Sequence, residues 1–330
     1  MRIFSLSAGV ACRTYSQALQ RAMVDFGADD SFAEAVKKMK EHYRIEVPES
    51  ALRSLTHQHA QTMLEEQELE SELGEGGVDL LIAQLDGSLV PIVTLDEAKE
   101  TDSKGDRRKM RKLEWKEARL SMVRRPEEVS KLYNATMRGV ELAGEQLLDC
   151  VIRAGGGKNT HIHCGGDGAV WIVRQVEDKL PGQVSYLVDF YHLSEYLSAA
   201  AEAVAGEEKE VWFSQQKERI KSNEVEKVLG ELRPKVEDRE VKEAEAPIRR
   251  CERYLRNRLE YMDYKGAIEA GMPIGTGEVE SGHRTVIQER LKLAGAWWKV
   301  ENAEKMLCLR VKRANGEWES YWERQRQAAA

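Results

Sequence analysis

Two aspartates of this sequence lie beside glycine residues in apolar surroundings. Asp86 comes directly before a glycine inside the apolar run of residues 78–93, and Asp167 has a glycine on each side. Bulky neighbours do not shield such a carboxylate, so a metal ion or a phosphate can approach it closely. A buried carboxylate must also be paired or bind a metal, because burying it alone is costly. An Asp-Gly pair is equally typical of a tight turn, and the sequence leaves that alternative open for both residues.

A third candidate acid lies in residues 272–287, where a turn containing Gly275 and Gly277 leads into a predicted helix. Glu278 and Glu280 are two residues apart, so they project roughly 200° from one another and only one can enter a given site. Glu278 lies in the first turn, where a carboxylate is favourable at the helix N-terminus and needs no other role. We therefore select Glu280.

Asp189 and His192 are three residues apart, where an apolar strand over residues 184–190 is expected to pass into a helix. One interpretation is structural, with Asp189 as the helix cap and His192 packed against its neighbours. The other interpretation is that the pair orients metal ligands or contacts a phosphate. The sequence leaves both interpretations open.

The spacing of apolar residues predicts a mixed α/β core that positions these acids. Strands are expected at residues 78–93, 115–123, 160–173 (interrupted at its central glycines) and 184–190, with a helix over 129–154 and a charged stretch at 96–111. Residues 193–272 follow a helical pattern rich in Glu, Lys and Arg and are predicted to form an all-α insertion. The core then resumes, and helices over 301–312 and 318–325 close the chain.

Helices are also predicted before the core, over residues 15–28 and 31–42 and from Pro48 onward. The last two form a helix-turn-helix pattern, a common DNA-reading motif. Most helix pairs of this kind only pack together, so the signal is weak. An acidic helix over residues 61–73 and the glycines that follow it are expected to end this region.

The charge is unevenly distributed, although the formal net charge is −7. Residues 61–79 hold seven acids and no base, whereas residues 99–125 hold eleven bases against five acids and residues 284–313 hold eight against three. Such basic segments favour a nucleic-acid partner, and ordinary solvated faces are the alternative. Bases interleaved with tryptophan suit a nucleic-acid backbone with unstacked bases, unless the tryptophans pack in the core. The candidate DNA-binding residues are Arg53, His57, Arg284, Arg290, Lys292, Trp297, Trp298 and Lys299.

Composition excludes several classes of protein. The chain has 330 residues, 42% of them hydrophobic and 32% charged, which is typical of a globular protein. No apolar run reaches the roughly 20 residues that a membrane helix needs, so no membrane partner is expected. The five cysteines are scattered without a Cys-x-x-Cys pair, which argues against a zinc ribbon or a disulfide framework and fits a reducing cytoplasm.

Together, the motifs resemble the bacterial insertion-sequence DDE transposases, and most closely the ISKra type within the Mutator-like superfamily. The resemblance covers most of residues 10–300 and rests on the order of motifs that are weak singly. These motifs are Asp86-Gly87, Gly166-Asp167-Gly168-Ala-Val-Trp-Ile, Asp189-x-x-His192, Gly275-Thr-Gly-Glu-Val-Glu280, and Gln288-x-Arg290-Leu-Lys-x-x-Gly295-x-x-Trp298.

The resemblance implies an α/β fold with a ribonuclease H-like catalytic core and an all-α insertion, preceded by a small helical region. It assigns catalysis and metal ligation to Asp86, Asp167 and Glu280, and an acid-x-x-His signature to Asp189 and His192. The implied domains are a helix-turn-helix-like DNA-binding region (1–77), the first part of the core (78–192), the insertion (193–272), and the completed core with a helical tail (273–330).

The implied chemistry is metal-dependent DNA cleavage and strand transfer. Carboxylate oxygens suit Mg²⁺, with Mn²⁺ as a substitute, and two such ions about 3.5–4 Å apart can activate water or a 3′-hydroxyl. The expected partners are DNA, both transposon ends and target, and further copies of the chain on that DNA, within the bacterial cytoplasm and at the nucleoid.

Other classes of function stay open. Relatives of this kind usually have a longer N-terminal region, so a truncated or domesticated DNA-binding protein without activity is one alternative. A ribonuclease H-like metal nuclease that cuts DNA without joining it is another. A purely helical interaction protein is disfavoured, because it gives no reason for the glycine-flanked acids.

Overall fold

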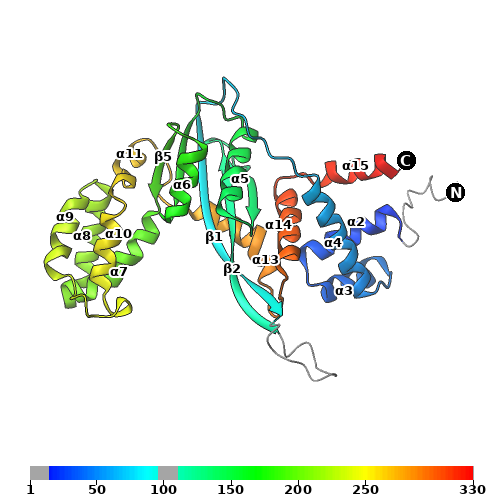
Figure 1. Ribbon diagram of the computed structural model, residues 1–330, viewed down its shortest axis with the longest axis horizontal. Coiled ribbons are helices and arrows are strands. Elements are labelled where there is room, and N and C mark those ends of the chain that lie inside the picture. Colours follow the sequence, from blue (N-terminus) through cyan, green and yellow to red (C-terminus); the bar gives the residue numbers. More distant parts are fainter. Residues whose placement is uncertain (1–14, 96–110, 330) are drawn as a thin grey trace.

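A mixed five-stranded sheet forms the centre of the molecule in the computed structural model, which describes residues 15–95 and 111–329 (Figure 1). The strands lie in the order β3-β2-β1-β4-β5. β2 runs antiparallel to β1 and β3, whereas β1, β4 and β5 are parallel to one another. The bounds are β1 (Leu80–Leu95), β2 (Arg111–Arg124), β3 (Leu132–Thr136), β4 (His161–Gly166) and β5 (Val184–Val188).

Both faces of the sheet are covered, which explains why β1 is apolar along most of its length. Leu81 and Leu85 pack on one face with helices α5 (Val140–Arg153) and α6 (Val170–Lys179). Val90 and Ile92 belong to the core on the other face. That face is covered by α12 (Gly277–Gly282), the π-helical turn η6 (His283–Gln288), α13 (Glu289–Leu291) and α14 (Val300–Ala314).

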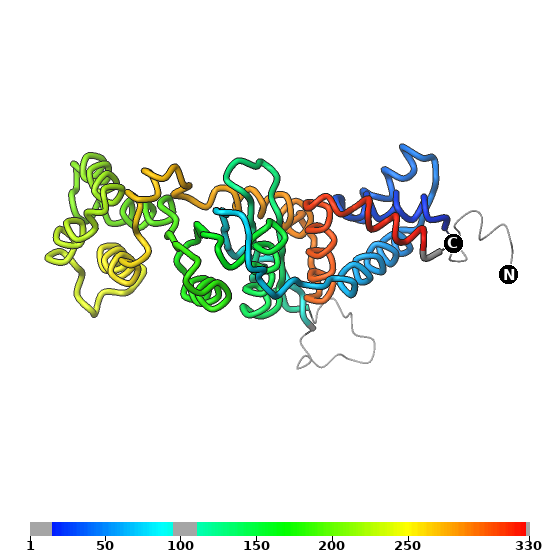
Figure 2. The backbone as a smooth tube through the Cα atoms, turned by 90° about the horizontal axis from the view of Figure 1, so that it is seen from above, coloured from blue at the N-terminus to red at the C-terminus, as the bar shows by residue number. Residues whose placement is uncertain are grey.

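A separate helical unit with a hydrophobic core of its own follows β5 and lies at one end of the elongated molecule (Figures 1 and 2). Its core contains the buried residues Leu197, Trp212, Leu229 and Tyr254. The helices are α7 (Phe190–Ala205), α8 (Lys209–Lys221), α9 (Val225–Leu232), α10 (Pro247–Arg256) and α11 (Tyr264–Glu269). The all-helical pattern predicted for residues 193–272 is therefore confirmed.

The N-terminal helices lie at the opposite end of the molecule, next to the last helix, α15 (Trp318–Ala329) (Figure 2). They are α2 (Gln17–Asp29), α3 (Phe32–Tyr43) and α4 (Glu49–Glu65), as the sequence predicted. Met63 of α4 and Trp322 of α15 are buried in the same core as the inner residues of α14. The N-terminal region and the C-terminal helices therefore stabilise each other.

Three predicted elements are wrong. The helix predicted over residues 129–154 is strand β3 followed by α5. The strand predicted over residues 160–173 ends at Gly166, and its second half begins α6, because Gly168 adopts a φ of +78° that turns the chain. The acidic helix predicted over residues 61–73 stops at Glu65.

The early end of α4 has a physical cause. Continuing the helix would place acids four residues apart, as at Glu66 and Glu70, and such pairs repel. The segment instead runs along the sheet, where the Glu70 N–H donates to Asp149 at 3.0 Å and Gln67 donates to Asn134 at 2.9 Å. Most of the charged stretch predicted at 96–111 lies outside the described residues. No helix of the described segments is long and apolar enough to cross a membrane.

A glycine pair tests how closely α2 and α4 are packed. A Cβ at Gly27 of α2 would collide with the Thr56 hydroxyl of α4, whereas a Cβ at Gly230 of α9 meets no atom within 4 Å. We expect Gly27→Ala to lower the free energy of unfolding by roughly 1–3 kcal/mol through overpacking. Gly230→Ala should raise it by roughly 0.5–1 kcal/mol, since alanine favours a helix. Urea unfolding of both variants measures this, and equal changes would contradict the packing described.

Candidate functional site

Three aspartates follow the parallel strands at one edge of the sheet. Gln84 of β1 pairs with Gly165 of β4, so Asp86 and Asp167 each lie two residues beyond a paired position on neighbouring strands. Asp189 directly follows β5. The prediction that Asp86 and Asp167 lie on neighbouring strands is confirmed, although Asp86 lies within the long strand β1 and not at its end. The carboxyl ends of parallel strands are where α/β folds bind ligands most often.

Helix α12 is fastened to this edge by Gln84. The Gln84 amide donates to the Gly275 carbonyl at 3.1 Å, and its oxygen accepts the Val279 N–H at 2.8 Å. Both groups at the start of α12 are thereby satisfied by one buried side chain. Gln84 and Asp86 project from the same face of β1 because side chains alternate along a strand. The start of α12 therefore lies over the face that carries Asp86.

Asp189 holds the same turn from the neighbouring strand. It is 3% exposed, and one carboxylate oxygen caps α7 by accepting the His192 N–H at 2.7 Å. The other oxygen accepts both the backbone N–H and the hydroxyl of Thr276. Both oxygens of Asp189 are thus occupied by protein donors, so the residue caps one helix and orients the start of another. The His192 side chain does not contact Asp189; its ring lies beside Tyr196 and Tyr254.

Glu278 and Glu280 project from α12 in different directions. Glu278 accepts two hydrogen bonds from Arg124 of β2, at 2.7 and 2.8 Å, and lies 3.2 Å from the Lys131 ammonium. Arg124 is the main cause of a pKa of Glu278 below its usual value. Glu280 is exposed, and no hydrogen bond or ion pair to it is found within residues 15–95 and 111–329. Glu278 is therefore committed to β2, whereas Glu280 is available for another role.

Asp86 is in contact with a histidine that the sequence reasoning missed. Its carboxylate, 27% exposed, lies 3.1 Å from Nε2 of His283, which is buried in η6. His283 follows Glu280 by three residues, so the two lie on adjacent turns of one helical segment. That spacing after a selected acid is the signal that could have identified it.

The loop at Asp167 is fixed by the helical unit. The Asp167 carbonyl accepts the Tyr254 hydroxyl at 2.8 Å, and the Gly168 carbonyl accepts Nε of Arg258 at 3.0 Å. One carboxylate oxygen of Asp167 accepts the Ala169 N–H at 2.7 Å, as in a turn. Gly168 cannot carry a side chain here, because its φ is positive and a Cβ would meet Arg258. The glycine is required by the loop that holds the acid.

The acids share an edge but do not form a closed coordination sphere. Among the residues that the structure describes, no three His, Cys, Asp or Glu side chains lie close enough together to hold a metal ion. The chemistry of Asp86, Asp167 and Glu280 nonetheless suits a hard cation, since all three offer carboxylate oxygens. Like charges repel across such a site, so the carboxylates would have to move together around a cation.

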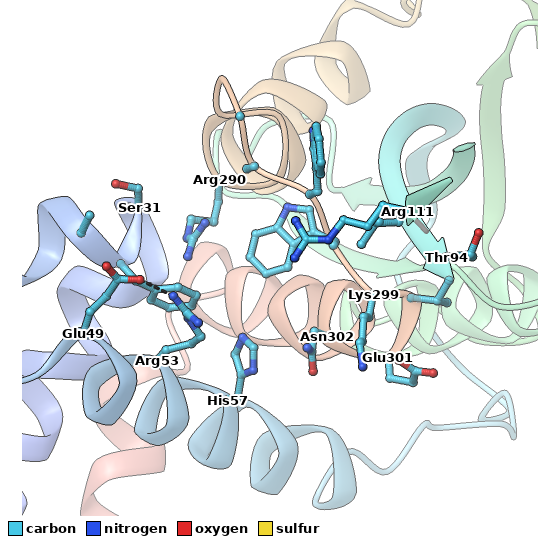
Figure 3. A pocket seen from close by; sticks show the side chains of 18 residues that line it. Ser31, Glu49, Arg53, His57, Thr94, Arg111, Arg290, Lys299, Glu301 and Asn302 are labelled. Atoms are coloured by element: carbon cyan, nitrogen blue, oxygen red, sulfur yellow. Dashed lines mark hydrogen bonds and ion pairs between the residues drawn. The ribbon is translucent and has the colours of Figure 1, made fainter. Parts of the chain in front are cut away.

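The candidate DNA-binding residues gather in a second place, a groove of about 850 Å³ between α4, residues 290–302 and the ends of β1 and β2 (Figure 3). Six of the eight line it, and we call this site the basic groove: Arg53, His57, Arg290, Trp297, Trp298 and Lys299. Arg284 is exposed outside it. Lys292 is also outside and donates to the Ser88 hydroxyl at 2.8 Å.

The sequence left open whether the two tryptophans are exposed or packed in the core, and the structure shows one of each. Trp298 is 5% exposed, because its backbone pairs with the end of β1 and its indole N–H donates to Leu291 at 3.1 Å. Trp297, the adjacent residue, is 52% exposed. Arg290 is 2% exposed, and its guanidinium lies 4.7 Å from the Phe32 ring and 4.9 Å from the Trp298 ring. Arg290 is therefore part of the groove floor.

Comparisons with known proteins give no family for the chain: no protein-family model matches it, and no curated protein matches it.

The ion pair of Glu278 predicts a pH-dependent stability. Glu278→Gln removes the charge that faces the partly buried Arg124 and should lower the free energy of unfolding at pH 7 by roughly 1–3 kcal/mol. Because the folded pKa is lowered, this stabilisation is complete above the unfolded pKa of about 4.3 and is lost as the pH falls through the folded pKa. Urea unfolding of variant and wild type between pH 7 and pH 3 should therefore converge at the acid end.

Glu280→Gln is the matched control, since it changes an exposed acid on the same helix. Its unfolding free energy should stay within about 0.5 kcal/mol of the wild-type value at pH 7. A larger loss for Glu280→Gln than for Glu278→Gln would reverse the roles given to the two acids.

Proposed function

We propose that the chain is a DDE transposase with a ribonuclease H-like core, which cleaves DNA and transfers its strands. The observation that carries the proposal is that Asp86 and Asp167 follow paired positions on neighbouring strands, and that the helix carrying Glu280 is hydrogen-bonded to the same strand through Gln84. These residues come from β1, the end of β4, and a helix that follows the separate helical unit. Gln84 and Asp189 fix the start of that helix at the same edge through buried hydrogen bonds. A glutamate without a role at this edge would not need its helix to be held there.

The sheet supports the same proposal. Only β2 runs against the other four strands, and Asp86 and Asp167 come from the adjacent parallel strands β1 and β4 in the centre of the sheet. The five helices between β5 and α12 then correspond to an all-α insertion in the core. The helices α3 and α4, joined through residues 44–48, correspond to the helix-turn-helix-like DNA-binding region.

Asp86, Asp167 and Glu280 would hold Mg²⁺ or Mn²⁺ through their carboxylate oxygens. When bound, such ions activate water or a 3′-hydroxyl and stabilise the oxygen that leaves the phosphorus. Asp189 is a positioning residue in this scheme, because both its oxygens hold protein groups. His283 keeps one side of the Asp86 carboxylate in contact with a buried ring and thereby limits its orientations.

The chain would act on transposon ends and target DNA as a homo-oligomer in the bacterial cytoplasm. The basic groove supplies positive charge for the backbone of that DNA. A second candidate function is DNA binding without chemistry, which is favoured by the lack of a closed metal cluster in the described residues. Salt-dependent DNA binding without any Mg²⁺-dependent product would support that function.

The decisive experiment is nicking of a supercoiled plasmid in Mg²⁺ or Mn²⁺. Asp86→Asn, Asp167→Asn and Glu280→Gln should each reduce nicking at least about 100-fold, because groups that only orient metal ligands already cost about 10- to 100-fold. Glu278→Gln, on the same helix, should retain nicking within a few-fold at a temperature where it is folded. Full nicking by Asp167→Asn would sink the assignment of the site.

Joining separates the proposed transposase from a nuclease. A linear duplex with a free 3′-hydroxyl should be joined to the plasmid by the wild type, whereas a nuclease of the same fold would only cut.

In the nicking assay, if Glu278→Gln lost nicking as completely as Glu280→Gln, the third acid would be misassigned.

A further inference from the structure

The floor of the basic groove holds two polar groups without partners. Nη2 of Arg290 and Nε2 of His57 are both buried and have no hydrogen-bond partner among the described residues. Nε of Arg290 donates to the Gly27 carbonyl at 3.0 Å, so only the outer part of the guanidinium is unsatisfied. Buried polar groups are nearly always hydrogen-bonded, and a lost partner is costly. An acceptor supplied by a ligand would satisfy both groups.

The charge of the groove indicates the kind of acceptor. Burial lowers the pKa of Arg290 to about 10, so its guanidinium is still charged at neutral pH. Burial is also the main cause of a His57 pKa of about 4, which leaves that ring neutral with one N–H to donate. Arg53, Arg111 and Lys299 add positive charge, whereas the lining acids are Glu49, which is paired with Arg53, and Glu301. An anion with several acceptor oxygens, such as phosphate, fits this surplus.

The geometry of the groove favours an unpaired strand over a duplex. Figure 3 shows Arg290, Arg53 and His57 pointing toward one end of the groove. The two unsatisfied nitrogens have almost no exposed surface, so a ligand oxygen must enter the groove deeply to reach them. A flexible single strand can do this more readily than a rigid duplex. The exposed ring of Trp297 lies on the same groove. In a duplex the base faces are already stacked, so only an unpaired base can stack on that ring.

We propose that the basic groove binds an unpaired DNA nucleotide, with its phosphate on Arg290 and His57 and its base stacked on Trp297. This inference rests on the proposed function only in taking DNA as the substrate. It adds that part of the DNA is single-stranded when bound. The volume of about 850 Å³ lies in the range of about 300–1,000 Å³ that is usual for pockets of small ligands, so a nucleotide fits.

The groove also has a defined spacing from the acids. Glu280 and Arg290 are ten residues apart on the continuous helical segment α12–η6–α13. At roughly 1.5 Å per residue this is about 15 Å along the axis. A DNA strand advances about 3.4 Å per nucleotide. The unpaired nucleotide would therefore lie about four nucleotides from the phosphate at the acid edge.

The test is equilibrium binding of fluorescent DNA in EDTA, where no metal-dependent step can contribute. The probes are a 12-nucleotide DNA single strand, the matched duplex, the strand with one abasic residue, and an RNA strand of the same sequence. We expect Trp297→Ala to weaken single-strand binding about 5- to 150-fold, as loss of one stacked base does, and to change duplex binding less than twofold. Trp115→Ala, which removes a tryptophan of similar exposure on β2, should change neither.

A second variant tests the phosphate contact without removing the charge. Arg290→Lys keeps the cation but not the fork of donors, and should weaken single-strand binding about tenfold while circular dichroism confirms folding. Inorganic phosphate should compete with the strand for the wild type and less well for Arg290→Lys.

Three outcomes would overturn the inference. These are single-strand binding by Trp297→Ala equal to wild type, equal losses for Trp297→Ala and Trp115→Ala, and an RNA strand bound more tightly than the DNA strand. Suppose the wild type binds the intact strand more tightly than the abasic strand but does not nick DNA in Mg²⁺. That result would reject the transposase function and support nucleotide binding in the basic groove. Normal nicking with an unchanged Trp297→Ala would reject the groove alone.

Discussion

The arrangement of the candidate site depends on one set of buried hydrogen bonds around the turn at Gly275 and Thr276. Gln84 reaches this turn from β1, and Asp189 reaches it from the end of β5. Without them, the start of the helix that carries Glu280 would lose its hydrogen bonds to β1 and to the end of β5, and the contacts of Glu278 and His283 further along would remain. Two buried polar side chains thus convert a distant segment of sequence into part of the sheet edge. The cost of burying them is offset because every polar atom named here finds a partner.

The helical unit has its own core, but it also holds the loops that follow β4 and β5. Tyr254 and Arg258, from its far end in the chain, hold the carbonyls of Asp167 and Gly168. Tyr264 of the same unit donates to the Val188 carbonyl at 2.9 Å, next to Asp189. The unit therefore braces the loops after β4 and β5 at the positions where the acids lie. A rearrangement of its helices would therefore reach these loops through these hydrogen bonds, and would reach β5 through Leu187 and Val188, which belong to the core of the unit.

Much of the secondary structure could be predicted from the sequence, because local residue patterns determine it. The apolar runs of β1 and β5, the helix over residues 31–42 and the long helical pattern after residue 193 all depend on neighbours in the chain. The choice of Glu280 over Glu278 rested on helix geometry and stays a prediction, whereas the two hydrogen bonds from Arg124 to Glu278 depend on tertiary contacts. The features that could not be predicted depend on contacts between distant parts of the chain. β3 is short and was absorbed into a helical pattern, and Trp298 is buried only because it pairs with Pro91 and Val93, some two hundred residues earlier.

The same dependence on distant contacts explains why the groove could not be predicted as a site. Its lining residues come from the start of α3, from α4, from the ends of β1 and β2, and from residues 290–302, which are brought together as α4 packs on α14. The acid edge and the groove are then joined twice, by the helical segment α12–η6–α13 and by β1, whose residues 86 and 93 are roughly 23 Å apart at 3.3 Å per residue. Val279, Val286 and Leu291 bury this helical segment along its length, so it cannot shift at one end alone. A strand anchored in the groove would therefore meet the acids in a fixed register, which is the geometric condition for cutting DNA at a set distance from a recognised nucleotide.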